Sequence, residues 1–167
     1  MHPRPALVAL RGYGGAQPDV DVLFCGHCGH VSDGHPSDRH ARVCLRCELG
    51  LLVAAAPGLA PGPDDAFMFV DGTLSLCGLS ARGEELLDIG EAQAINRHIT
   101  EFLVPADAET SGPEALVNLI VHAARGDDAV HDVVVRPTAE FGIRHWAHIG
   151  SCGPPRAALI VLSDDAR

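Results

Sequence analysis

The sequence predicts an α+β protein: a small metal-binding ribbon, followed by a five-stranded antiparallel sheet that carries helices on one face. Three observations lead to this prediction. Two Cys-x-x-Cys pairs lie within the first 50 of the 167 residues. A segment rich in proline and glycine follows them at residues 57–65. Beyond it, two apolar runs of strand length, a helical region and three more apolar runs succeed one another.

The cysteine pairs are separated by fifteen residues, and their members are Cys25, Cys28, Cys44 and Cys47. Four thiolates at this spacing can close a tetrahedron around one metal ion. A module of about forty residues buries too little apolar surface to fold alone, so the metal must supply roughly 10 kcal/mol or more of its folding free energy. We therefore predict a zinc ribbon over residues 21–56 with one structural zinc ion, preceded by a loosely ordered segment at 1–20.

Other interpretations of the cysteines remain open. They include two disulfides, four free thiols, and an iron site of the kind found in the electron carrier rubredoxin. An iron site would need a tight aromatic shell, and Phe24 is the only aromatic residue between positions 20 and 60. Four histidines crowd the same stretch. Because four thiolates already fill a tetrahedron, we expect these imidazoles to lie in solvent; they are His27, His30, His35 and His40.

The charge is distributed unevenly. Up to residue 60, five arginines balance five acidic residues, whereas beyond it seven arginines face seventeen carboxylates and account for the net charge of −10. Nucleic-acid binding needs a basic patch, so we expect none by this chain alone. No apolar run approaches the roughly 18 residues of a membrane span, and the N-terminus lacks a signal-peptide pattern. Six cysteines suit a reducing compartment, so we predict a cytoplasmic protein.

The predicted ribbon strands are Asp21–Phe24, a short piece at Val31, and Leu49–Val53. The segment 57–65 resists both helix and sheet, and we place the domain boundary there. The second domain is then predicted to span residues 66–167.

A hairpin opens the second domain. Its strands are Ala66–Val70 and Leu74–Leu79, joined by the turn Asp71–Thr73. Ser80 is predicted to cap a helix over Ala81–Leu87.

Further helices and three strands complete the domain. Two short helical pieces are predicted at Glu91–Arg97 and His98–Leu103. The longest helix is predicted to begin near Pro113 and to end before Gly126. The three closing strands are Val130–Arg136, Ile143–Gly150 and Ala157–Leu162.

This order of elements resembles that of a PAS domain over about residues 66–164. The patches that carry the resemblance are Phe69–Gly72 leading into Leu79–Leu87, and Val104–Asp107. PAS domains are sensory or interaction modules, so the resemblance implies a regulatory protein that acts through protein contacts and has no catalytic activity. Another α+β domain with a five-stranded sheet and helices on one face is the alternative.

The resemblance also raises the question of a bound cofactor or small-molecule ligand. Some PAS domains hold haem through a helix histidine. His122 lies on the predicted long helix, one turn after Asn118, so both are expected to face a cavity between that helix and the sheet. A haem sensor is therefore an alternative. A covalent flavin site is disfavoured, because Cys77 lies in a strand and residues 81–103 contain no cysteine.

Catalytic motifs are lacking. No serine or cysteine has the sequence context of an activated nucleophile, and no glycine-rich phosphate loop follows a strand. Cys77 and Cys152 are interpreted as a buried strand cysteine and an incidental loop cysteine. The alternatives are a redox pair, or a cysteine-dependent enzyme that uses a histidine such as His98.

Two predicted strands, Ala66–Val70 and Ala157–Leu162, are apolar at consecutive positions, so both faces of the sheet need cover. Helices are expected on one face only. We predict that the outer face packs against the ribbon or forms a homodimer. In the strand between, alternation places His145 on the core face and Trp146 with His148 on the opposite face.

Overall fold

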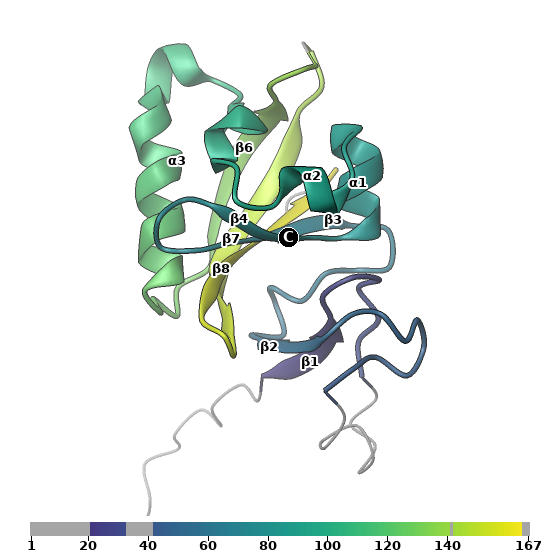
Figure 1. Cartoon of the computed structure of the whole chain (residues 1–167). Helices are drawn as coiled ribbons and strands as arrows, with labels where there is room; N and C mark the ends of the chain where they lie inside the picture. The colour runs from purple at the N-terminus through teal and green to yellow at the C-terminus, as the bar shows by residue number, and fades with distance from the viewer. Residues whose placement is uncertain (1–20, 33–41, 141, 165–167) are drawn as a thin grey trace, which may run out of the picture.

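The computed structural model describes residues 21–32, 42–140 and 142–164 (Figure 1). His35, His40 and the predicted N-terminal segment 1–20 lie outside this part of the chain. The strands are β1 Val22–Cys25, β2 Leu52–Ala55, β3 Ala66–Val70, β4 Leu76–Leu79, β5 Leu103–Pro105, β6 His131–Pro137, β7 His145–Gly153 and β8 Ala157–Ser163. The helices are α1 Ala81–Leu87, α2 Glu91–Ala94, the short 3₁₀ helix η1 Ile99–Glu101, and α3 Ala108–Ala124. Among the described residues, no helix has the length and apolar character needed to cross a membrane.

The order of the elements follows the prediction, and two differences stand out. Helix α3 begins at Ala108, five residues before Pro113. Threonine, serine and glycine lead into that proline and have low helix propensity, so the sequence pattern hides the first turns. Leu103, predicted as the last residue of a helical piece, instead begins β5, because Leu103–Pro105 pairs with β6 in antiparallel register.

One antiparallel sheet contains both the ribbon and the larger unit. The strand order is β1-β2-β7-β8-β3-β4, with β6 also paired to β7 and β5 paired to β6. Strand β7 makes this possible because it is nine residues long. One of its edges pairs with β8, while the other pairs with β6 as far as Ile149 and then with β2 at Cys152 and Gly153. The ribbon hairpin therefore continues the sheet (Figure 1).

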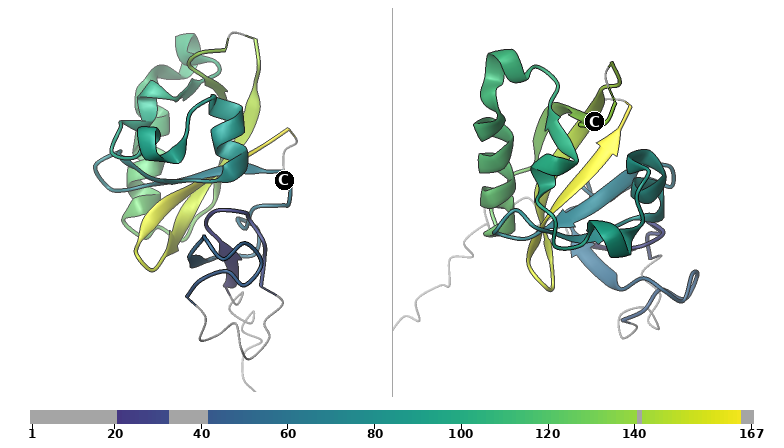
Figure 2. Two further views of the ribbon diagram at one scale, coloured as in Figure 1. Left: turned by 45° about the vertical axis from the view of Figure 1, so that its right-hand side comes forward. Right: turned by 45° about the horizontal axis from the view of Figure 1, so that its top comes forward.

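The inner face of the sheet holds the main core. Alternate residues of β3, β7 and β8 pack against α3 and the shorter helices, and Figure 2 shows the helices grouped away from the β1–β2 hairpin. Ser80 caps α1 as predicted: its hydroxyl accepts a hydrogen bond from the Gly83 N–H at 3.0 Å. The same hydroxyl also accepts one from the Phe67 N–H at 2.9 Å, which ties the helix to β3.

The outer face is covered by the ribbon. Its buried cluster comprises Phe24 and Ala55 of the ribbon, Leu59, and residues of the sheet that include Phe67, Leu159 and Val161. Three phenylalanine rings meet there: Phe24 and Phe67 are 5.7 Å apart edge to face, and Phe24 and Phe69 are stacked at 6.2 Å. Of the two kinds of cover expected, the structure thus contains the docked ribbon.

The segment 57–65 is part of this packing. Leu59 is fully buried. It packs closely on β7, since a Cβ atom placed on Gly150 of that strand would lie 2.7 Å from the Cδ2 atom of Leu59. The Asp65 carboxylate accepts a hydrogen bond from the Gly62 N–H at 2.7 Å, which closes a turn. The expected semi-rigid linker is therefore fixed against the sheet through Leu59.

His148, which alternation places on the face opposite the core, is nevertheless buried. Its Nδ1 atom lies 2.6 Å from the Asp132 carboxylate of β6, and its Nε2 atom lies 2.9 Å from the Ser163 hydroxyl of β8. A buried imidazole with both nitrogens bonded joins three neighbouring strands.

We expect Leu59→Ala to destabilise the chain by about 2 to 4 kcal/mol, because the substitution leaves a cavity between the segment 57–65 and β7. Urea unfolding of the metal-loaded protein measures this free energy. The control is Ile143→Ala, since Ile143 is 45% exposed and lies outside the ribbon, so its truncation should change stability by no more than about 0.5 kcal/mol. Equal effects of the two substitutions would show that Leu59 does not hold the segment on the sheet.

Candidate metal centre

The structure brings the four predicted cysteines together. Their sulfur atoms all lie within 4.8 Å of one another. Cys25 and Cys47 are separated by 3.6 Å between sulfurs, and Cys28 and Cys44 by 3.9 Å. A tetrahedral zinc ion with Zn–S bonds of about 2.3 Å requires sulfur separations of about 3.8 Å. The four sulfurs therefore fit one tetrahedral metal ion.

Two similar turns position the cysteines. In the first, Cys25 ends β1 and its carbonyl accepts a hydrogen bond from the Gly29 N–H at 3.0 Å. In the second, the Cys44 carbonyl accepts one from the Glu48 N–H at 2.9 Å. The Gly26 N–H donates to the Leu51 carbonyl at 2.8 Å and links the two turns. The local chain thus holds the pairs face to face.

Backbone amides point at the sulfurs. The N–H groups of His27 and Cys28 donate to Cys25 Sγ, and that of Arg46 donates to Cys44 Sγ, each at 3.4 Å. Hydrogen bonds of this kind favour the thiolate, which is the form that binds metal.

The thiols differ in acidity without metal. Burial raises the pKa of Cys25 to about 12, against the effect of the two amides. For Cys47 burial acts in the same direction, but the Gly50 and Leu49 amides and the neighbouring thiols lower the pKa to about 6. Binding of a metal ion must displace the protons of the less acidic thiols, so metal affinity falls as pH falls.

Gly50 closes the site and was not identified from the sequence. A Cβ atom there would collide with Cys25 Sγ and would lie 2.8 Å from the His27 Cβ atom. Only glycine fits between the two turns. The usable signal in the sequence is its place three residues after Cys47.

An aromatic shell lies beside the first turn. A Cβ atom on Gly26 would be 3.3 Å from the Phe69 ring, and one on Gly29 would be 3.3 Å from the Phe67 ring. Both phenylalanines come from β3. Both lie beyond residue 60, so the aromatic content of residues 20–60 does not reveal them.

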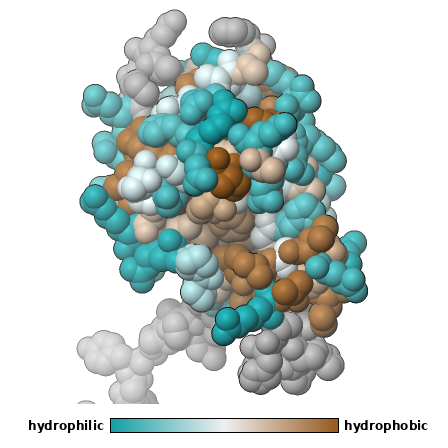
Figure 3. Space-filling view, viewed as in Figure 1, coloured by the Kyte–Doolittle hydropathy of each residue, from teal (hydrophilic) through white to brown (hydrophobic). Residues whose placement is uncertain are grey.

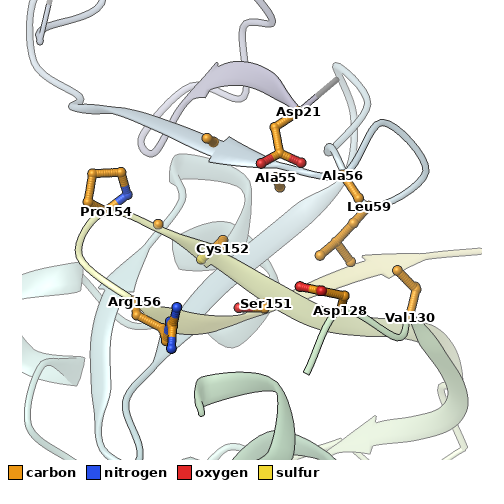
Figure 4. Close-up of a pocket in the computed structure, with 12 residues that line it drawn as sticks. Asp21, Ala55, Ala56, Leu59, Asp128, Val130, Ser151, Cys152, Pro154 and Arg156 are labelled. Carbon is orange, nitrogen blue, oxygen red and sulfur yellow. The ribbon is translucent and has the colours of Figure 1, made fainter. Parts of the chain in front are cut away.

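Two cavities flank the ribbon. One, of about 530 Å³, lies beside the second cysteine turn; its walls include Leu49, Leu51, Val53, Phe69 and Cys77. We call it the ribbon groove. The other, of about 710 Å³, lies where β2 meets the end of β7 and is lined by Asp21, Asp128 and Arg156 among others (Figure 4).

The two predicted cofactor residues lie elsewhere. His122 and Asn118 are both exposed on α3, whereas Leu116 and Ile120 of the same helix are buried in the core. Neither residue lines the ribbon groove or the cavity of Figure 4. This corrects the expectation that they face a cavity, because the apolar positions of α3 turn the opposite side of the helix toward the sheet.

The remaining two cysteines differ from their interpretation in the sequence, because Cys77 is exposed and Cys152 is a buried residue of β7 and not of a loop. Cys152 is buried, and burial with a smaller contribution from Cys77 raises its pKa to about 12. Cys77 is exposed as a residue and borders the ribbon groove, yet burial of the thiol and the Asp71 charge raise its pKa. His98 instead caps η1, with its Nδ1 atom accepting from the Thr100 N–H at 3.3 Å.

We expect Gly50→Ala to weaken metal binding strongly, because the added methyl group occupies the space of Cys25 Sγ and His27. Competition with a chromophoric chelator measures the metal affinity. Gly58→Ala is the matched control, since a Cβ atom there meets nothing within 4 Å. Unchanged affinity in Gly50→Ala would contradict the close approach of the two turns.

We expect Cys77 and Cys152 to react slowly with iodoacetamide in the metal-loaded protein at neutral pH. A raised pKa leaves little thiolate, so the rate should increase as pH rises toward the pKa. Mass spectrometry of the wild type and of Cys77→Ser and Cys152→Ser assigns each rate. Faster reaction than a free model thiol at pH 7 would instead favour the cysteine-dependent enzyme.

Comparisons with known proteins give structural neighbours only. No protein-family model matches the sequence, and no curated protein matches it. The structure is similar to the PAS domain of a protein from Colwellia psychrerythraea, with 18% identity and a TM-score of 0.42, over 60% of this chain and 86% of that chain. It is also similar to a chain of the Escherichia coli DhaR(N)–DhaL complex, with 17% identity and a TM-score of 0.39, over 65% of this chain and 34% of that one.

Proposed function

We propose that this chain is a non-catalytic cytoplasmic regulatory protein, in which a structural zinc ion stabilises a ribbon packed on a PAS-like sheet. It acts through contacts with protein partners. The observation that carries the proposal is the set of four cysteine sulfurs within 4.8 Å of one another, at the end of a hairpin that belongs to the main sheet.

The position of the metal site supports a structural role for the ion. Cys25 is the last residue of β1 and one of the four candidate metal ligands, and Phe24 beside it is fully buried against the sheet. An ion that fixes Cys25 therefore also fixes Phe24 in the outer-face cluster. Closing the metal site and covering the sheet are then one event, which suits a structural ion.

The PAS-like role is supported by the resemblance of the sequence and by the order of the elements. The opening hairpin and capped first helix of that resemblance form β3, β4 and α1. The space between α3 and the sheet is filled by apolar side chains, including Leu116, Ile120 and Ile149. A filled core favours signalling by protein contact over binding of a ligand at that place.

An iron electron carrier is the second candidate, and the aromatic shell favours it. Phe67 and Phe69 approach the first cysteine turn, and both rings pack against Phe24 of the ribbon. Apolar rings beside a four-thiolate site exclude water from the metal, which suits an iron centre as well as a zinc one.

We expect protein purified without added metal to contain one zinc ion per chain and to be colourless. Elemental analysis and an absorption spectrum test this directly. Iron with thiolate absorption bands and no zinc would replace the proposal by the electron carrier. A Soret band would show haem, and absence of any metal from a folded chain would contradict a metal-stabilised ribbon.

A further inference from the structure

The second cysteine turn carries an unusual concentration of exposed apolar side chains. The structure describes seven exposed large apolar residues, and five of them lie in the ribbon. Four are within nine residues of one another: Val43, Leu45, Leu49 and Leu51. We call these four the ribbon patch. Figure 3 shows apolar side chains gathered over the ribbon, at the lower right of the molecule.

The patch is left exposed by the part of the chain that the structure describes. The hairpin uses Phe24 and Ala55 to cover the outer face of the sheet, while Leu49 and Leu51 border the ribbon groove beside that face. Val43 and Leu51 form a β-bridge with each other, which fixes them side by side. Leu45 and Leu49 are 70% and 74% exposed. Four such side chains amount to a few hundred Å² of apolar surface. The largest apolar patch on a typical monomer is about 300 to 600 Å², and such patches are often functional.

We propose that the ribbon patch is the contact surface of a symmetric homodimer, with a second copy of this chain as its occupant. This inference rests on the proposed function, since it makes the ribbon the part that contacts a partner. It moves the expected dimer from the outer sheet face, which the ribbon itself covers, to the ribbon.

The area suits a second copy. A standard interface buries about 800 Å² on each partner, and somewhat more than half of that area is apolar. The patch supplies most of this apolar part. The ribbon groove continues it, because Leu49 and Leu51 line both. Leu45 protrudes without lining the groove, so it is available to enter the groove of the other copy.

The charges around the patch are self-complementary. Arg46 and Glu48 are exposed and alternate with Leu45, Cys47 and Leu49 along the turn. In a two-fold contact, residue i of one copy meets residue j of the other and the reverse. Arg46 of each copy can then meet Glu48 of its partner, so both charges are paired without a foreign protein.

Sedimentation of the metal-loaded full chain over a range of concentrations tests the dimer, with metal content measured on the same samples. We expect a reversible monomer–dimer equilibrium. Leu45→Ser with Leu49→Ser should weaken dimerisation at least about tenfold, because truncating central apolar contacts costs more than 1 kcal/mol. The matched control is Ile143→Ser, which removes an apolar residue that is 45% exposed outside the ribbon and should leave the equilibrium unchanged.

Charge reversal provides the second arm. Arg46→Glu and Glu48→Arg should each weaken the dimer, and their combination should restore it. A monomer at every concentration with one metal ion per chain would overturn the dimer and leave the proposed zinc ribbon intact. A dimer that the leucine substitutions do not affect would also overturn the proposed interface. So would a monomer that binds lipid vesicles, if the leucine substitutions abolish that binding. A dimer that persists in a chain without metal would count against the zinc ribbon only.

Discussion

The outer face of β3 and β8 must be kept from water, and much of the molecule is arranged around that requirement. Both strands are apolar at consecutive positions, and helices cover only the inner face. Phe67, Leu159 and Val161 therefore need a second layer, which Phe24, Ala55 and Leu59 provide. Burying one such side chain contributes about 1.5 to 3 kcal/mol, so the contact between ribbon and sheet is comparable to the whole stability of a small domain.

The cover is itself too small to be stable alone. Strands β1 and β2 contain four residues each, and an isolated two-stranded hairpin is at best marginally stable in water. Two supports act on its two ends. Pairing of Ala54 and Ala55 with β7 fixes one end to the sheet, and the four cysteine sulfurs, which are close enough to hold a metal ion, lie at the other. The Pro- and Gly-rich segment adds a third attachment through Leu59. The division into ribbon, linker and larger domain describes the sequence, while in the structure the ribbon and the larger domain share one sheet and the linker packs on it through Leu59.

Local signals in the sequence predicted the elements well. The strand Ala66–Val70 and the helix Ala81–Leu87 have the expected bounds, because each has an apolar pattern and a clear punctuation residue. The metal cysteines were also predictable from spacing. Long-range effects were not. Phe67 and Phe69 lie beyond the linker in the sequence but beside the first cysteine turn in the structure. Strand β5 forms because β6 lies beside it. The partners of the buried His148 are Asp132 and Ser163, which lie on neighbouring strands. Such contacts depend on strand order, which a single sequence does not reveal.

The same strand order places the four cysteines beside the part of the ribbon that remains exposed to solvent. The ribbon has two sides, and the sheet takes the side that holds Phe24, while the cysteine turn between Cys44 and Cys47 presents the other to solvent. The conformation of that turn is tied to the sulfur atoms, since the Arg46 N–H donates to Cys44 Sγ and the missing side chain of Gly50 leaves room for Cys25 Sγ. Leu45 and Leu49 therefore lie on a segment whose shape is tied to the positions of the cysteine sulfurs. A metal ion bound by these sulfurs would fix both the part of the ribbon that covers the sheet and the turn that is exposed to solvent.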